Sequence, residues 1–238
     1  MQQKFTILFL LFVVATSRVV GQSNSESAPQ KRAISTTSLF EAHNLQFATM
    51  SNNGVSLNVN PRYSYYFNLG VDFNVNITSR LKPFTGIYVK NIGVIVKEAE
   101  TVTKHRGYYL GAPLGVKVYG KNHKNYLKLG TDFNYALNYK QKTFVDGDKK
   151  DKFNEWGSDR IVEWYPSIFA GFQYEGLSMC LNYYYNNFFN TEYTNNGVRP
   201  YSGADVQMVT VSFGYHIDNK SAQRKLKQRI KKSREVKS

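Results

Sequence analysis

The chain has 238 residues, of which 42% are hydrophobic and 15% aromatic, and its formal net charge is +14. Its single cysteine, Cys180, excludes an internal disulfide framework. The charge does not indicate a nucleic-acid-binding face, because Lys220–Ser238 holds nine Lys or Arg against one Glu and so contributes +8 by itself.

The N-terminal segment has the organisation of a secretory signal peptide. Lys4 provides the positive start, and Phe5–Ala15 is an apolar run too short to span a membrane as a helix. Gly21 suits the small position before a cleavage site, so we expect residues 1–21 to be a signal peptide. Residues 22–38 are polar and serine-rich without an apolar period, which predicts a flexible periplasmic segment.

The clearest structural pattern is the alternation along Arg62–Ile77. Its odd positions are all apolar or aromatic, whereas its even positions are mostly polar. A period of two indicates a β-strand, because successive side chains point to opposite faces of a sheet. The segment is longer than the roughly 5–6 residues usual for a strand, and long enough for the about 9–11 residues of a membrane-crossing strand. We therefore expect an apolar face toward lipid and a polar face toward a lumen.

Seven further segments are predicted to be strands. Lys104–Tyr119 alternates as clearly as Arg62–Ile77, although Pro113 cannot donate to a sheet ladder and so predicts a local bulge. In Pro83–Lys97 the apolar positions change parity near Asn91, which also predicts a bulge. The complete set is Leu39–Met50, Arg62–Ile77, Pro83–Lys97, Lys104–Tyr119, Asn125–Lys140, Arg160–Tyr174, Leu177–Asn190 and Asp205–Ile217.

These segments predict an all-β fold, an eight-stranded antiparallel transmembrane up-and-down β-barrel over residues 39–217. The connections after the second, fourth and sixth strands are short, and the others are longer, above all the charged loop Gln141–Asp159. Outer-membrane barrels have short periplasmic turns and longer external loops. We therefore expect the barrel in the cell outer membrane with both termini in the periplasm.

Two sets of barrel side chains follow from the alternation. Inward charges in the periplasmic half are expected to form a network that fills the narrow lumen, with Lys128 as the nearest partner for Asp132. A proton or ion path through these groups is the alternative. The predicted lumen charge network is Asp72, Lys117, Lys128 and Asp132. The predicted aromatic girdle is Tyr63, Tyr65, Tyr139, Trp164 and Phe189 near the outer rim, with Tyr174 and Tyr215 near the inner rim.

Residues 218–238 are predicted to be a short basic periplasmic tail. Leu226 and Ile230 stand four residues apart, but two apolar residues cannot anchor a buried helix. The tail is therefore either solvated or makes an electrostatic contact with anionic lipid headgroups, an acidic periplasmic protein or an anionic cell-wall polymer. Its basic residues include Arg224, Lys225, Lys227, Arg229, Lys231, Lys232 and Arg234.

The strand sequences resemble a known family. RYSYYFNLGVDFNVNI, FTGIYVKNIG, YYLGAPLGVKVYG and the closing VTVSFGYHI are similar to the outer-membrane β-barrel family that includes PorT-like proteins. The resemblance covers roughly Leu39–Ile217, whereas the basic extension after Ile217 departs from the common ending, in which the last strand closes the chain. The resemblance implies a small outer-membrane barrel, and some family members are implicated in an apparatus that exports proteins across the outer membrane.

The sequence indicates no catalytic, metal or cofactor site, because none of its four His residues stands at metal-ligand spacing. We expect a non-enzymatic structural or interaction component of a secretion or envelope assembly, with outer-membrane lipid and an envelope protein as partners and no nucleic acid. Two alternatives stay open. One is an outer-leaflet lipid-modifying enzyme with His105 and Glu163 near the outer rim, and the other is a small pore.

Overall fold

The computed structural model describes residues 34–121 and 124–218, apart from the side chains of residues 66, 67, 217 and 218. The predicted signal peptide, residues 22–33 of the predicted flexible segment, and residues 219–238 of the predicted tail lie outside these ranges. In the described part of the chain, no helix is long and apolar enough to cross a membrane.

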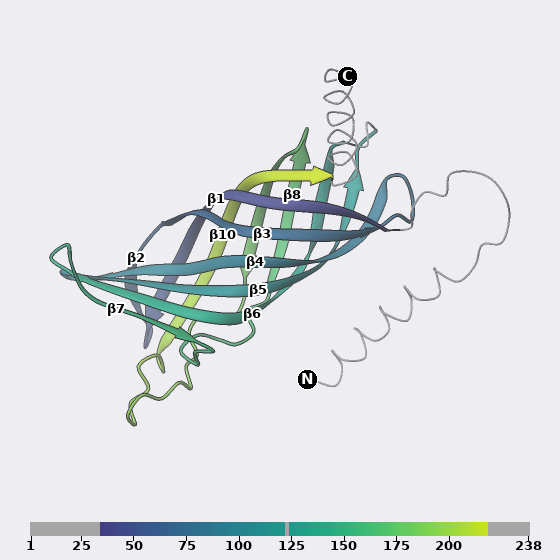
Figure 1. The fold of residues 1–238 in the computed structure, drawn as a ribbon. Helices are drawn as coiled ribbons and strands as arrows, with labels where there is room; N and C mark the ends of the chain where they lie inside the picture. The colour runs from purple at the N-terminus through teal and green to yellow at the C-terminus, as the bar shows by residue number, and fades with distance from the viewer. Residues whose placement is uncertain (1–33, 122–123, 219–238) are drawn as a thin grey trace, which may run out of the picture. The chain divides into compact units, whose positions relative to one another are not determined.

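The described residues form ten strands of one antiparallel sheet (Figure 1). Because β10 pairs with β1, eight strands close into a ring in the order β1, β3, β4, β5, β6, β8, β9, β10. This ring confirms the predicted eight-stranded antiparallel up-and-down barrel. The strands are β1 (Ile34–Asn52), β2 (Val55–Asn60), β3 (Arg62–Val75), β4 (Leu81–Glu98), β5 (Thr101–Tyr119), β6 (Tyr126–Val145), β7 (Asp148–Trp156), β8 (Ser167–Tyr174), β9 (Leu177–Tyr184) and β10 (Ala204–Asp218).

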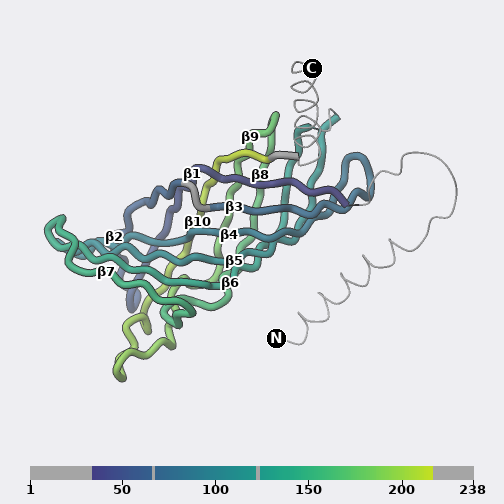
Figure 2. Tube along the Cα trace, in the orientation of Figure 1, coloured from purple at the N-terminus to yellow at the C-terminus, as the bar shows by residue number. Residues whose placement is uncertain are grey.

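The two ends of the barrel differ in their connections, as the trace in Figure 2 shows. One end, here called the turn end, carries the short β3–β4 and β8–β9 connections. The other, here called the loop end, carries the β4–β5 and β6–β7 turns and the longer segments before β8 and β10. β2 pairs with β1 and β4 at the loop end, and β7 pairs with β6 there, so these two strands extend the sheet beyond the ring.

The alternation that forms the strands also sorts their side chains between the outside and the inside of the ring. Large apolar side chains are exposed on the outward face of every ring strand. Cross-strand pairing joins outward positions into continuous rows, one of which runs through Leu129, Ala170, Leu181, Val211 and Leu45. Each ring strand contributes at least one exposed, outward apolar side chain; examples, in chain order, are Phe47, Leu69, Ile87, Leu110, Leu129, Ile168, Leu181 and Phe213.

The first strand differs from its prediction at its start and in its pattern. It begins at Ile34, inside the segment predicted to be flexible, because its first half pairs with β3. Its register against β10 shifts between Phe40 and His43. The shift inverts the parity of the strand, so that both Glu41 and Asn44 are buried. This irregularity is the reason why the sequence alternates clearly only in the second half of β1.

The bulges predicted near Asn91 and at Pro113 are wrong. β4 and β5 keep one register from Leu81 to Glu98, and Pro113 stays in register with its β6 partner. The inward positions of β4 therefore continue with the same parity past Asn91, and Ile92 becomes buried like Lys90 before it. The apparent change of parity in the sequence is a change in the kind of side chain that fills the barrel.

The predicted loop Gln141–Asp159 is also wrong, because most of it is a β-hairpin. β6 continues to Val145, and β7 pairs back along it from Asp148. The two turn residues, Asp146 and Gly147, both have positive φ, +52° and +83°, as a tight two-residue hairpin turn requires. Conversely, β8 begins only at Ser167 and β9 ends at Tyr184, so both are shorter than predicted.

Candidate functional site

The charged lumen toward the turn end is organised around two buried ion pairs. Asp72 and Lys117 are both fully buried, and their carboxylate oxygen and ammonium nitrogen are 2.6 Å apart. Tyr88 donates a second hydrogen bond to Asp72 at 2.5 Å. Asp132 forms its ion pair with Lys90, whose side chain is also buried. Each carboxylate thus has an opposite charge in contact, as burial of ionised groups requires.

Lys128 does not have the partner predicted for it, because the carboxylate of Asp132 is paired with Lys90 instead. The Lys128 ammonium lies 5.7 Å from the centre of the Phe169 ring. Lys128 also lines a cavity that it shares with Glu41, Asp132 and Cys180. This cavity has about 10 Å³ of space, enough for about one water molecule. The four predicted network residues are therefore all buried, but in a different pairing.

A second polar network joins the neighbouring strands β1, β3 and β4. Arg62 donates to the Oε1 atom of Gln46 at 2.6 Å and to the Oδ1 atom of Asn91 at 2.7 Å. Asn68 accepts from the backbone amide of Asn91 and donates to Glu41 at 2.9 Å. The guanidinium of Arg62 is therefore connected to the carboxylate of Glu41 through the side chain and backbone amide of Asn91 and the side chain of Asn68, and all five residues of the network are buried.

The sequence prediction missed Glu41, Arg62 and Lys90. Arg62 stands among the polar even positions of its segment, and Lys90 has the inward parity set by Ile87 and Val89, so both could have been found. Glu41 could not, because the register shift in β1 hides its direction. With these residues, the described lumen holds three buried carboxylates (Glu41, Asp72, Asp132) and four cations (Arg62, Lys90, Lys117, Lys128).

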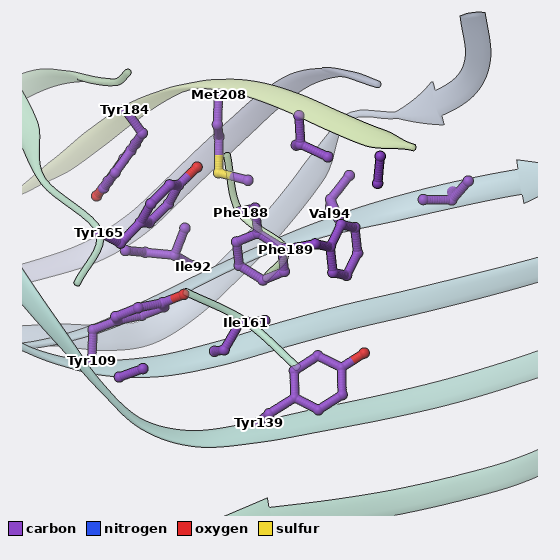
Figure 3. Close-up of a cluster of buried hydrophobic side chains, with 14 residues drawn as sticks. Ile92, Val94, Tyr109, Tyr139, Ile161, Tyr165, Tyr184, Phe188, Phe189 and Met208 are labelled. Carbon is purple, nitrogen blue, oxygen red and sulfur yellow. The ribbon is translucent and has the colours of Figure 1, made fainter. Parts of the chain in front are cut away.

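Toward the loop end the lumen is filled by aromatic and aliphatic side chains (Figure 3). The rings of Tyr165 and Tyr184 stack with centroids 4.6 Å apart, and Phe188 meets Phe189 edge to face at 5.1 Å. We call this cluster the aromatic plug. It consists of Ile92, Val94, Val96, Tyr109, Ala136, Tyr139, Ile161, Tyr165, Tyr184, Phe188, Phe189, Ala204, Val206 and Met208.

The girdle prediction is wrong for two residues, Tyr139 and Phe189, because their exposed fractions are 0% and 1%. The register of β6 against β5 shifts next to Leu137, which turns Tyr139 inward. Phe189 lies beyond the end of β9, in a segment that bridges to Ile161 inside the barrel mouth. The other predicted girdle residues, Tyr63, Tyr65, Trp164, Tyr174 and Tyr215, are exposed.

The two groups considered for lipid chemistry are not brought together. His105 is buried against the plug, where its Nδ1 atom hydrogen-bonds the Tyr139 hydroxyl at 2.6 Å and its ring meets Phe189 edge to face. Burial lowers the pKa of His105 to about 3, so the ring is neutral at physiological pH. Glu163 is exposed. Within the described ranges, no three His, Cys, Asp or Glu side chains gather where they could hold a metal ion.

No family model matches the sequence, and no curated protein matches it. Among solved structures, the chain is similar to Ail, the attachment invasion locus protein of Yersinia pestis, in complex with the heparin analogue sucrose octasulfate, with a TM-score of 0.38, 10% identity, and coverage of 77% of this chain and 99% of that chain. It is also similar to Neisserial surface protein A, with a TM-score of 0.41, 12% identity, and coverage of 78% of this chain and 98% of that chain. A third similarity is to the outer membrane protein OprG of Pseudomonas aeruginosa, with a TM-score of 0.35, 13% identity, and coverage of 77% of this chain and 95% of that chain. At these TM-scores and identities, the similarities carry no inference about binding or activity.

Proposed function

We propose that this protein is a non-enzymatic outer-membrane β-barrel that serves as a structural or interaction component of the cell envelope. One observation carries the proposal: a closed ring of eight strands exposes apolar side chains on every strand while its interior is filled. On β5 the outward apolar positions run from Leu110 to Val118, which is about the 9–11 residues that a tilted strand needs to cross a bilayer. A soluble barrel would present polar side chains at these positions.

The filled lumen favours a scaffold over a pore. Ion pairs occupy the half toward the turn end, and the aromatic plug occupies the half toward the loop end. The buried position of His105 likewise gives no support to a lipid-modifying enzyme, since its ring is packed against Phe189 and Tyr139 rather than directed to the surface. Contacts with partners would then be made by the loop end, where β2, β7 and the segment before β10 extend beyond the ring.

The proposal includes an orientation, with the turn end and both termini in the periplasm. It rests on the short connections at the turn end and on the even number of ring strands, which returns the chain to the side on which it started. The resemblance of the strand sequences to PorT-like proteins favours a role in a secretion or envelope assembly. The basic tail would then reach an acidic periplasmic protein, an anionic cell-wall polymer or anionic lipid headgroups.

Four measurements test this proposal. The protein should fractionate with the outer membrane, and its mobility on a gel should change on boiling; recovery in the soluble periplasm would reject it. A C-terminal epitope tag should resist protease on intact cells and become accessible when the outer membrane is opened. In planar bilayers the folded protein should give no steady conductance, and well-defined channels would favour the pore instead.

A further inference from the structure

The extended sheet at the loop end carries most of its positive charges on one face, whereas Lys150 is ion-paired with Asp148. Three of them lie directly opposite one another across three strands, because Lys104 on β5 pairs with Lys142 on β6, which pairs with Lys152 on β7. In the next row, Arg106 pairs with Lys140. Residues directly opposite in an antiparallel sheet, and residues two apart in one strand, share a face. We call this surface the basic face, and it comprises Lys97, Lys104, Arg106, Lys140, Lys142, Lys149 and Lys152.

The carboxylates of the same hairpin fall on the other face of the sheet. Asp148, Asp151 and Glu155 on β7 pair with Val145, Thr143 and Tyr139, which alternate with the basic positions of β6. Among the described residues, none of the seven cations forms an ion pair. Two of them contact aromatic groups: the Lys104 ammonium lies 4.6 Å from the Phe144 ring centre, and Arg106 donates to the Tyr108 hydroxyl at 3.2 Å.

Like charges directly opposite one another in a sheet are destabilising. Slight desolvation, followed by the positive charges of Lys140, Arg106, Lys152 and Lys149, lowers the pKa of Lys142. A surface that gathers cations in this way without carboxylates becomes more stable when anions bind to it.

The position of the basic face indicates where those anions come from. Along the outward face of β5, apolar Leu110 is followed by Tyr108, then Arg106 and Lys104. This order of apolar, aromatic and cationic side chains matches the order of hydrocarbon, interface and headgroup in a bilayer. Arg106 lies about 13 Å along the strand from Leu110, within reach of the headgroup layer for a tilted strand and a long side chain. On the other side of the ring, β10 places Asp205 at the loop end.

We propose that the basic face binds the phosphate groups of anionic lipid headgroups in the outer leaflet around the barrel, on the side formed by β4 to β7. This proposal rests on the proposed function, because it requires the apolar ring to lie in a membrane. The surface is continuous with the lipid-facing positions of β5, so the anions it meets are those of the lipids that already surround the barrel. The binding is one-sided, and it would orient the β6–β7 hairpin against the membrane surface.

A tryptophan beside the basic face allows a direct test. Trp156 at the end of β7 is 74% exposed and lies on the same face as Lys152 and Lys140, because it pairs with Asn138 in the β6–β7 register. The chain has two tryptophans, so Trp164→Phe leaves Trp156 as the single fluorophore. The full-length Trp164→Phe protein would be folded into phosphatidylcholine vesicles containing either brominated phosphatidylcholine or brominated phosphatidylglycerol at equal fraction.

We expect the brominated anionic lipid to quench Trp156 with a relative association constant roughly tenfold above that of the zwitterionic lipid. The triple variant Lys104→Gln/Arg106→Gln/Lys142→Gln should reduce this ratio to about one. The matched control is Arg199→Gln, which removes an exposed cation that is ion-paired with Glu192 elsewhere in the described chain. It should leave the ratio unchanged.

The outcomes separate this inference from the proposed function. If both brominated lipids quench Trp156 equally in the protein whose basic face is intact, and this protein still shows a gel shift on boiling, headgroup binding is overturned. The proposed membrane barrel is then unaffected. Failure of the protein to enter vesicles at all would instead reject the proposed function. If inorganic phosphate at millimolar concentration abolishes the anionic preference, the face binds free phosphate rather than lipid, and the proposal is overturned. The gel shift of the triple variant shows whether it has folded.

Discussion

The two halves of the lumen are filled by opposite kinds of side chain on the same strands. β4 contributes Lys90 to the charged half and Ile92, the next inward position, to the aromatic plug. β6 changes in the same way between Asp132 and Ala136. The comparison shows that the interior of this narrow barrel must be filled but need not be apolar. Charges are accommodated where Asp72 and Asp132 each meet a cation and Glu41 accepts a hydrogen bond from Asn68, and apolar groups where they pack together.

The largest effect is expected from breaking an ion pair in the charged half. Asp132→Ala should destabilise the protein by about 3–5 kcal/mol, because it leaves the Lys90 ammonium buried without its partner. Urea unfolding in detergent micelles measures the loss. The double variant Asp132→Ala/Lys90→Met should recover much of it, whereas Asp132→Ala/Lys128→Met should not. Additive effects of Asp132 and Lys90 would refute their pairing.

A comparable truncation in the apolar half should lower the stability because it creates a cavity, and not because it leaves a charge without a partner. Met208 is buried in the plug, and Met208→Ala should cost about 2–5 kcal/mol. Its neighbour Val209 points outward, so Val209→Ala serves as the control and should cost much less. The same unfolding experiment gives both values, and it should show no dependence of the Met208 effect on salt. Equal losses for the two variants would mean that the plug is not closely packed.

His105 packs against the plug residues Tyr139 and Phe189, and its effect on stability should depend on pH. The folded-state pKa of His105 is about 3, below the ordinary value of about 6.5, so between these values the unfolded state binds more protons. Stability from this group is therefore complete above about pH 6.5 and falls as the pH decreases toward 3. His105→Gln should flatten the wild-type decline between about pH 6.5 and about pH 4. Parallel stability curves for the two proteins would contradict this.

The smallest effect is expected from a hydroxyl in the plug. The Tyr109 hydroxyl is buried, and no hydrogen-bond partner is found for it among the described residues. Tyr109→Phe should therefore change the stability by less than about 1 kcal/mol, in either direction. The control is Tyr88→Phe in the charged half, which removes a hydrogen bond to Asp72 and should cost about 1.5–3 kcal/mol. A larger loss at Tyr109 than at Tyr88 would reverse the comparison between the halves.

The sequence by itself determined the fold class and the inward direction of many lumen side chains, because the alternation of apolar and polar side chains is a local pattern of consecutive residues. It placed Asp72, Lys117, Lys128 and Asp132 at positions that are all buried, and it placed outward aromatic residues such as Tyr63, Tyr174 and Tyr215 on the exterior. It also contained the Asp146–Gly147 turn signal, although the surrounding charges favoured a loop.

The tertiary structure alone decided which side chains meet. Lys90, and not Lys128, lies beside Asp132, because cross-strand register joins residues far apart in the chain. Register shifts turned Tyr139 inward and hid the direction of Glu41. A shift of one residue inverts the faces of all the residues after it, and the pairing of two strands, which no single segment encodes, determines where that shift occurs.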